Sequence, residues 1–496
     1  MLPVSYNIEI VDYAFPNQEQ VVNSSRRAEL GQYMTPHQIA RFMVSLFDHS
    51  KYANIRLLDP GAGFGALSTA FLETCCSNEW MKKVEVVAYE IDPFFKVNLL
   101  KHLEKYSNIN SNLFSVNVIE KDFIEESVNS ILSKKFKKFT HAILNPPYKK
   151  INSQSVHRQL LHNIGIETVN LYTAFLALTM HLVEDGGEIV AIIPRSFCNG
   201  SYYKSFREDL LKKVSIKQIH LFNARDKAFK DDSVLQENII MHLVKGGNQG
   251  DVLLSFSNDD SFSDCSSYQC PFENILNDND EEFFIRIPSE KDLSSLIESR
   301  SLKYTLAEIN IEVSTGPVVD FRLKEFLCFQ SQSDTAPLLY PCHFEKNNIC
   351  WPKDNIKKPN AIKITQETEK WLWPNGFYVV VRRVSSKEEK RRIVASVVNP
   401  GFSNSTKIAF ENHLNVFHFG KNELDRDLAY GLAAFLNSSR VDTSFRSFNG
   451  HTQVNATDLR SLKYPGREQL FEIGNWVQNY SDLTQDEIDK KIESLD

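Results

Sequence analysis

A strand, a glycine-rich turn and a helix follow one another near the start of the chain, and this succession restricts the fold strongly. Residues 55–58 (Ile-Arg-Leu-Leu) are typical of a buried strand, and residues 59–65 (Asp-Pro-Gly-Ala-Gly-Phe-Gly) of a tight turn that opens a helix. Gly61, Gly63 and Gly65 allow the backbone to approach a ligand closely. The three-glycine phosphate fingerprint is not matched, so the turn by itself indicates only a nucleotide-type pocket in an α/β domain.

Further polar residues follow the ends of successive predicted strands. The second strand, residues 84–89, runs into Glu90, and the fourth, residues 141–144, runs into Asn145. Ligands bind at the carboxyl ends of parallel strands, and an acid after the second strand is where α/β sheets hold ribose hydroxyls. A third segment ends at Asp122-Phe123, and we therefore expect Asp59, Glu90, Asp122 and Asn145 to form one pocket at this edge of the sheet.

The tetrapeptide Asn145-Pro146-Pro147-Tyr148 ends the fourth predicted strand. Each proline disfavours a helical conformation of the residue before it, so the loop is stiff. It presents the side-chain oxygen of Asn145 and the carbonyl of Pro146 as fixed acceptors beside an aromatic ring. Such a loop can hold a flat molecule by an exocyclic NH2 group; a rigid turn without a ligand is the alternative interpretation.

A helix is predicted from about His37 to Asp48, because apolar residues recur there at helical spacing. We expect Thr35 to cap this helix, with Pro36 at the first helical position. The free N–H groups at this end would also receive a carboxylate, which makes Thr35 a candidate cofactor contact. A good cap without a ligand is the alternative.

The remaining first half alternates in the same way. Residues 171–182 are predicted to form a helix, and residues 188–193, 216–222 and 238–244 to form strands, the last of which ends the sheet. Phe229 precedes the last strand and is separated from it by a polar stretch. It is interpreted either as a substrate contact or as a core residue.

The order of these motifs resembles that of the N6-adenine DNA methyltransferases of restriction–modification systems, in the gamma arrangement. In that arrangement the cofactor motifs precede the catalytic motif and the target-recognition region comes last. Residues 451–459 (His-Thr-Gln-Val-Asn-Ala-Thr-Asp-Leu) resemble a segment found late in such enzymes, and the chain is most similar to the BsuBI/PstI-like group. The resemblance rests mainly on residues 28–245.

The resemblance implies an α/β fold, with a Rossmann-like S-adenosylmethionine-dependent methyltransferase domain followed by an α+β target-recognition domain. The expected parts are an N-terminal arm (1–28), the catalytic domain (29–246), a linker region (247–282) and the recognition domain (283–496). The resemblance assigns catalysis to Asn145, Pro146 and Tyr148 and substrate binding to Phe229. It assigns S-adenosylmethionine binding to Thr35, Asp59, Gly61, Gly63, Glu90, Ile91, Asp122 and Phe123.

The residue types suit this chemistry. The lone pair of adenine N6 is delocalised into the ring, and acceptors that hold both N–H bonds would localise it. A stacked base cannot reach the loop, so the adenine must be flipped out, which costs a few kcal/mol. Stacking on Tyr148 and Phe229 would offset roughly 1–3 kcal/mol of that cost, and the Tyr148 hydroxyl is expected to matter less than its ring.

Three functional alternatives remain open at the level of sequence. Asn-Pro-Pro-Tyr also occurs in RNA and protein-glutamine methyltransferases, and a non-catalytic nucleic-acid-binding module could keep the fold. About 250 residues follow the catalytic half, which favours recognition of double-stranded DNA. A cognate restriction endonuclease is then the functional partner.

Composition limits the kind of DNA-binding surface, the metal content and the cellular location that are expected. The net charge is −7, so a DNA-binding surface must be a local basic patch. The eight cysteines form no Cys-x-x-Cys pair, and no metal site is expected. No apolar run reaches the ~18 residues of a membrane span, and the N-terminus lacks a signal-peptide pattern, so a cytoplasmic protein is expected.

Overall fold

The computed structural model describes residues 35–77, 81–222, 237–277, 280–293, 302–345, 348–386, 388–450, 452–480 and 483–494. The chain forms two compact units. The first comprises Met1–Pro194, Asp209–Asn248 and Phe256–Ser266, and the second comprises Arg195–Glu208, Gln249–Ser255 and Ser267–Asp496. Phe229 lies outside the described residues.

Residues 247–282, which were expected to link two domains, contain regular structure. They form β8 (Val252–Ser257), β9 (Ser266–Cys270) and the short helix α9 (Phe272–Ile275). Val252 and Leu254 are two positions apart, so their side chains point to the same face of the strand, and both are fully buried. The Gly- and Ser-rich composition of this stretch suggested a linker, although the stretch contains strands with buried residues.

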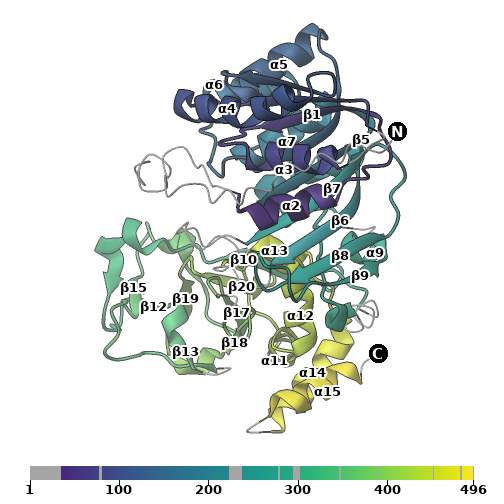
Figure 1. Cartoon of the computed structure of the whole chain (residues 1–496). Coiled ribbons are helices and arrows are strands. Elements are labelled where there is room, and N and C mark those ends of the chain that lie inside the picture. The colour runs from purple at the N-terminus through teal and green to yellow at the C-terminus, as the bar shows by residue number, and fades with distance from the viewer. Residues whose placement is uncertain are drawn as a thin grey trace. The chain divides into compact units, whose positions relative to one another are not determined.

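The first unit is an α/β domain in which helices and strands alternate (Figure 1). Its strands β1 to β5 are parallel neighbours in the order β3-β2-β1-β4-β5. The elements are α2 (His37–Ser45), β1 (Asn54–Pro60), α3 (Ala66–Cys76), β2 (Lys83–Tyr89), α4 (Pro93–Ile109), β3 (Phe114–Ile119), α5 (Phe123–Ser133), β4 (Phe139–Leu144), α6 (Val156–Asn163), α7 (Leu171–Leu182), β5 (Val183–Pro194), β6 (Val214–Phe222) and β7 (Asn238–Lys245). Helix α8 (Lys204–Lys213) is divided between the two units, since the first unit resumes at Asp209.

The prediction that residues 238–244 end the sheet is wrong. Strand β7 lies between β5 and β6 and is antiparallel to both. Its consecutive residues Ile239, Ile240 and Met241 are fully buried, so both faces of the strand are covered. A continuous apolar run indicates burial on both faces but does not tell which strands are the neighbours.

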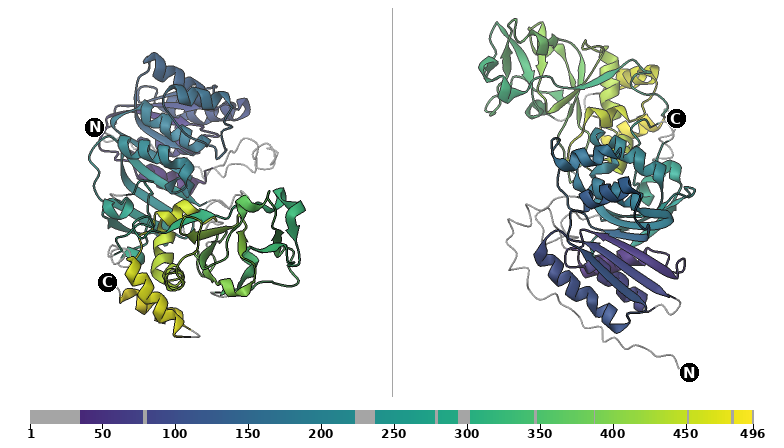
Figure 2. Two further views of the ribbon diagram at one scale, coloured as in Figure 1. Left: turned by 180° about the vertical axis from the view of Figure 1, so that it is seen from behind. Right: turned by 90° about the horizontal axis from the view of Figure 1, so that it is seen from above.

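Helices cover both faces of this sheet. Successive strand residues point to opposite faces, and Leu57 and Leu58 of β1 are both fully buried. Leu57 belongs to a core cluster with residues of α2, α3 and α4. Helix α5 contacts both α6 and α7, and these helices form a second group (Figure 1), while Figure 2 shows helices on both faces of the sheet. This layering leaves the carboxyl ends of the parallel strands as the edge where loops can form a site.

The second unit combines two mainly antiparallel sheets, each with one parallel strand pair (β14 with β18, and β12 with β19), with helices. One sheet has the strand order β10-β20-β17-β18-β14-β13 and another the order β11-β15-β12-β19-β16. The strands are β10 (Glu312–Thr315), β11 (Leu327–Cys328), β12 (Thr335–Leu339), β13 (Phe344–Glu345), β14 (Asn348–Ile349), β15 (Ala361–Lys363), β16 (Trp373–Pro374), β17 (Tyr378–Arg382), β18 (Ala395–Val398), β19 (Lys407–Phe410) and β20 (Leu414–His418). The helices are α11 (Arg426–Leu436), α12 (Ser439–Phe448), α13 (Ala456–Arg460), α14 (Arg467–Gln478) and α15 (Gln485–Glu493).

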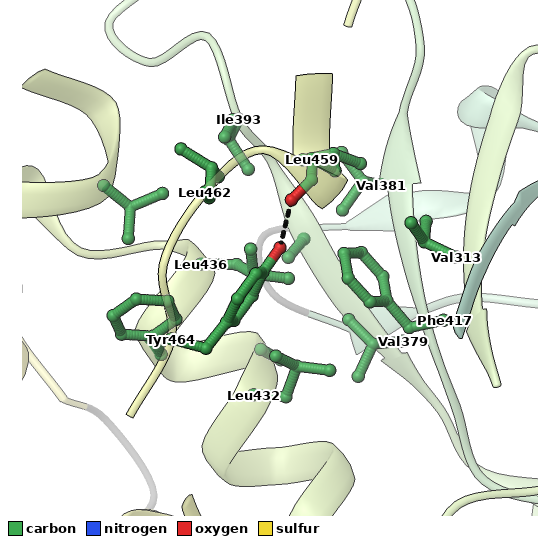
Figure 3. Packing of buried hydrophobic residues seen from close by; sticks show 14 of the residues in the cluster. Val313, Val379, Val381, Ile393, Phe417, Leu432, Leu436, Leu459, Leu462 and Tyr464 are labelled. Carbon is green, nitrogen blue, oxygen red and sulfur yellow. Dashed lines mark hydrogen bonds between the residues drawn. The ribbon is translucent and has the colours of Figure 1, made fainter. Parts of the chain in front are cut away.

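The main core of the second unit joins the sheet to these helices (Figure 3). Val379, Val381 and Phe417 project from the sheet towards the helical residues Leu432 and Leu436. The buried hydroxyl of Tyr464 donates to the carbonyl of Leu459 at 2.7 Å, which satisfies its one polar group inside the core.

Candidate active site

A cavity with a volume of about 250 Å³ lies in the first unit, at the carboxyl ends of its parallel strands. Most of the residues that the sequence assigned to cofactor binding or catalysis line it: Thr35, Gly61, Gly63, Glu90, Ile91, Asp122, Phe123 and Asn145. These residues come from the loops after β1, β2 and β4, from the start of α5, and from Thr35, which precedes the N-cap of α2. The prediction that strand ends meet at one edge is therefore confirmed.

The turn after β1 is shaped by its three glycines. Gly61, Gly63 and Gly65 all have positive φ, at 74°, 56° and 86°. A Cβ at Gly65 would lie 2.5 Å from Cδ1 of Leu99, whereas one at Gly63 would meet nothing within 4 Å. Gly65 is therefore required for packing, while Gly63 lies open to the cavity.

Glu90 connects this turn to the end of β2. Its Oε2 accepts from the backbone N–H of Gly63 at 2.8 Å and its Oε1 from that of Asp92 at 2.8 Å. Burial raises the pKa of the Glu90 carboxyl, and these two N–H groups act in the opposite direction. Each carboxylate oxygen retains a second lone pair, so the group can still accept from a pair of hydroxyls in the cavity.

Asp122 begins α5 and pairs with a histidine that sequence reasoning missed. Its Oδ1 accepts from the N–H of Glu125 at 2.9 Å, and its Oδ2 lies 3.0 Å from Nε2 of His157. Burial raises the pKa of the Asp122 carboxyl, but the bonds from His157 and Glu125 outweigh it and hold the pKa below its ordinary value. The same hydrogen bond raises the pKa of His157. His157 follows Asp122 by 35 residues, and no spacing pattern marks it.

The amide of Asn145 is held at both ends. Its Nδ2 donates to Oγ1 of Thr35 at 3.0 Å, and its Oδ1 accepts from the hydroxyl of Tyr148 at 3.0 Å. The prediction that Thr35 caps α2 is wrong, because Pro36 occupies the N-cap position and the Thr35 hydroxyl is engaged by Asn145 instead. Thr35 still lines the cavity.

Three of the assigned residues do not line the cavity. Asp59 is buried behind the turn, and its Oδ2 accepts from Oγ of Ser68 at 2.5 Å. Burial raises the pKa of the Asp59 carboxyl to about 7, although the Ser68 bond lowers it. Pro146 is buried beside the cavity, and Tyr148 is half-buried with its ring centroid 6.2 Å from that of Tyr172. These residues therefore adjoin lining residues of the cavity without lining it themselves.

Aromatic rings form the apolar wall of the cavity. Phe123 packs against Phe175 with 4.9 Å between ring centroids and against Tyr89 with 5.2 Å. Phe95 lies edge-on to Phe64 at 4.6 Å. Apolar walls with a few placed polar groups are typical of a site for a cofactor with a flat ring.

Comparison with known proteins identifies the family of this chain. Residues 38–229 match the family model of the Eco57I restriction-modification methylase. The type II methyltransferase M.BsuBI of Bacillus subtilis is 52% identical over 479 residues, which cover 95% of this chain and 94% of that protein. The chain belongs to the type II methyltransferases of restriction–modification systems. The type II methyltransferase M.PstI of Providencia stuartii, in the same family, is 42% identical and matches 99% of this chain and 97% of its own length.

Solved structures agree with the fold. The type IIL restriction-modification enzyme MmeI in complex with DNA superposes with a TM-score of 0.53 at 13% identity, over 92% of this chain and 72% of that one. S-adenosylmethionine is the cofactor of this methyltransferase, as the sequence predicts. Among the described residues, no helix is both long and apolar enough to cross a membrane.

Proposed function

We propose that this protein is a site-specific DNA methyltransferase that methylates N6 of a flipped-out adenine. The observation that carries this proposal is the fixed amide of Asn145, which borders the cavity and is oriented by Thr35 and Tyr148. An acceptor that needs no reorganisation during the reaction is worth most where charge or geometry changes in the transition state.

The loop serves the amino group of adenine in two ways. The Tyr148 hydroxyl donates to Asn145 Oδ1, and the same oxygen would accept from an exocyclic N–H of the target adenine. The carbonyl of Pro146 is the second acceptor, and its fixed backbone holds the second N–H bond. With both N–H bonds held, the nitrogen lone pair is directed away from the ring, and the amino group becomes nucleophilic.

The residues of the cavity hold the cofactor, which supplies an activated methyl group when it is bound. Glu90 accepts from the ribose hydroxyls, and Asp122 accepts from the adenine amino group of the cofactor. Phe123 and Ile91 contact the flat ring, and Gly61 and Gly63 allow the backbone to come close. Thr35 stands where the cofactor site and the catalytic loop meet, because it lines the cavity and binds Asn145.

Base capture and target choice complete the proposed cycle. Tyr148 stacks on one face of the flipped adenine, with Phe229 assigned to the other. Residues 29–246 form the catalytic domain and residues 283–496 recognise the DNA target. Methylation at that target would protect DNA from a cognate restriction endonuclease.

Incubation of the full chain with labelled S-adenosylmethionine and unmethylated plasmid DNA tests this function. The label is expected in DNA, as N6-methyladenine, within one short sequence. The Glu85→Gln variant, changed on β2 outside the cavity, is the matched control and should behave as the unaltered protein does. Label on RNA, on protein glutamine or on another base would contradict the proposal.

A further inference from the structure

Four segments that are distant in sequence lie side by side at one edge of the second unit. Residues 315–318, 411–415, 382–385 and 452–454 are neighbours in that order. The first three segments lie at neighbouring ends of strands β10, β20 and β17 (Figure 1). The fourth segment joins them through the bridge between Val384 and Gln453. We call these four segments the recognition edge. They include residues 452–454 of the segment 451–459 that stood out in sequence; residue 451 lies outside the described residues.

The backbone on either side of Gln453 is fixed by hydrogen bonds. The N–H of Ser385 donates to the carbonyl of Thr452 at 3.0 Å, and the N–H of Val454 donates to that of Arg383 at 2.8 Å. Nδ2 of Asn449 donates to the carbonyl of Gln453 itself at 3.1 Å. The segment therefore has the stiffness of a strand, although it is a loop between two helices.

A buried polar network lies beneath this segment. Nη2 of Arg392 donates to Oδ1 of Asn449 at 2.9 Å, and Nδ2 of Asn449 donates to Oδ2 of Asp458 at 3.1 Å. All three residues are at least 97% buried, as is Asn415, whose Nδ2 donates to the carbonyl of Val454 at 2.7 Å. Buried polar groups are costly unless they are hydrogen-bonded. In this network Asn449 and Asn415 donate to the carbonyls of Gln453 and Val454, so the network fixes the loop backbone.

The side chains that this backbone presents are exposed. Val384 is 51% exposed, and Thr452 and Gln453 are exposed beside it. Among the described residues, the Gln453 amide has no hydrogen-bond partner. His413 lies in the segment 411–415, next to the segment that carries Val384. Its position is fixed because buried Glu411 accepts from its backbone N–H at 2.9 Å and from its Nδ1 at 2.7 Å.

Cations lie within the recognition edge and next to it. Nη1 of Arg383 donates to the carbonyl of Asn412 at 3.1 Å, and Lys358 pairs with Asp320, two residues after the bridge of Val318 to Glu411. Arg322 is exposed in the same turn. Cations of this kind neutralise phosphates, whereas a neutral amide with a donor and an acceptor matches a base edge such as N6 and N7 of adenine.

We propose that the recognition edge reads base edges of the DNA target and that Gln453 is a specificity-determining residue. This inference rests on the proposed DNA methylation. The amide of Gln453 makes a bidentate contact to one base pair, and exposed Val384 supplies an apolar contact next to it. The cations within and next to the edge hold the phosphates and carry no sequence information.

The test compares Gln453→Ala and Gln453→Glu in the full chain, with Gln366→Ala as the control. Gln366 is also an exposed glutamine of the second unit, in a turn before residues 369–371. Each protein is incubated with S-adenosylmethionine and unmethylated plasmid DNA, and N6-methyladenine is mapped by single-molecule sequencing. Melting temperature and cofactor affinity are measured in parallel to verify the fold.

The proposal predicts that Gln453→Ala loses discrimination at one position of the target, by about ten- to one hundredfold, while the other positions remain specified. Gln453→Glu should shift the preference at that position towards cytosine, since a carboxylate accepts from N4. Gln366→Ala should keep the original target. An unchanged target in both Gln453 variants, or a uniform loss at every sequence, would overturn the proposal. Absence of DNA methylation by the unaltered protein would instead refute the proposed function.

Discussion

The hydroxyl of Tyr148 donates a hydrogen bond to the side-chain oxygen of Asn145 at 3.0 Å, and Thr35 accepts from the other end of the same amide. The amide is thereby held in one orientation before any substrate arrives. The ring and the hydroxyl of Tyr148 thus have separable parts in the proposed mechanism, one in stacking and one in positioning.

Tyr148→Phe keeps the stacking ring and removes the positioning bond. We expect the variant to stay active with kcat lowered about three- to tenfold, since one neutral hydrogen bond contributes roughly 0.5–1.5 kcal/mol. Tyr148→Ala should also lose about 1–3 kcal/mol of base capture, and less when the target adenine is mispaired. A fluorescent base analogue at the target position reports the flipping. If the two variants are equally inactive, stacking is the wrong role for Tyr148.

Glu90→Gln should weaken S-adenosylmethionine binding by at least about tenfold. The substitution replaces one acceptor oxygen by an NH2 group that cannot accept from Gly63 N–H or from a ribose hydroxyl. Titration calorimetry measures the effect, with Glu85→Gln as the control, because Glu85 lies on β2, the strand that ends just before Glu90, and pairs with Arg56 outside the cavity. Equal affinities of the two variants would remove Glu90 from the cofactor site.

The pair of Asp122 and His157 predicts a defined pH dependence. The pKa of His157 is raised, so its contribution to stability is present below its ordinary pKa of about 6.5 and is lost as the pH rises through the higher folded-state value. The pKa of Asp122 is lowered, so its contribution is present above about 4 and is lost as the pH falls through the lower folded-state value. The ion pair is therefore most complete between about pH 4 and 6.5.

An NMR titration of the His157 ring tests this pair. The pKa of His157 should lie above its ordinary value in the unaltered protein, and Asp122→Asn should bring it down. A histidine pKa that does not respond to Asp122→Asn would show that the two side chains are not paired in solution.

The glycines of the turn after β1 should differ in their tolerance of a side chain. Gly63→Ala should cost about 1 kcal/mol of unfolding free energy, from its positive φ alone. Gly65→Ala should cost several kcal/mol, because its Cβ also collides with Leu99. Denaturant unfolding without cofactor measures both. Equal costs would show that Leu99 moves aside.

The layout of the site follows from the sequence where position along a strand decides it. Residues such as Glu90, Asp122 and Asn145 stand at or after strand ends, and parallel strands bring those ends to one edge whatever their exact order. The alternation of apolar and glycine-rich segments was therefore sufficient to predict both the α/β domain and its pocket.

Contacts between distant side chains could not be predicted in this way. Thr35 and Asn145 are 110 residues apart, and nothing in the local pattern distinguishes a helix cap from a partner of the catalytic amide. His157 and the recognition edge are similar cases, since periodicity reports which residues are buried but not which loops become neighbours. The insertion of β7 between β5 and β6 escaped prediction for the same reason.

Asn145→Ala tests the central claim most directly. Transfer of a labelled methyl group to a duplex that carries the mapped target is measured under single-turnover conditions, together with the affinities for DNA and for S-adenosylmethionine. Because the Asn145 acceptor acts mainly in the transition state, the rate of transfer should fall on the order of one hundredfold or more, with both affinities within about twofold of the unaltered protein. A rate that stays within a few-fold of the unaltered protein, or a loss explained entirely by weaker DNA binding, would contradict the assignment of Asn145 to the reacting amino group.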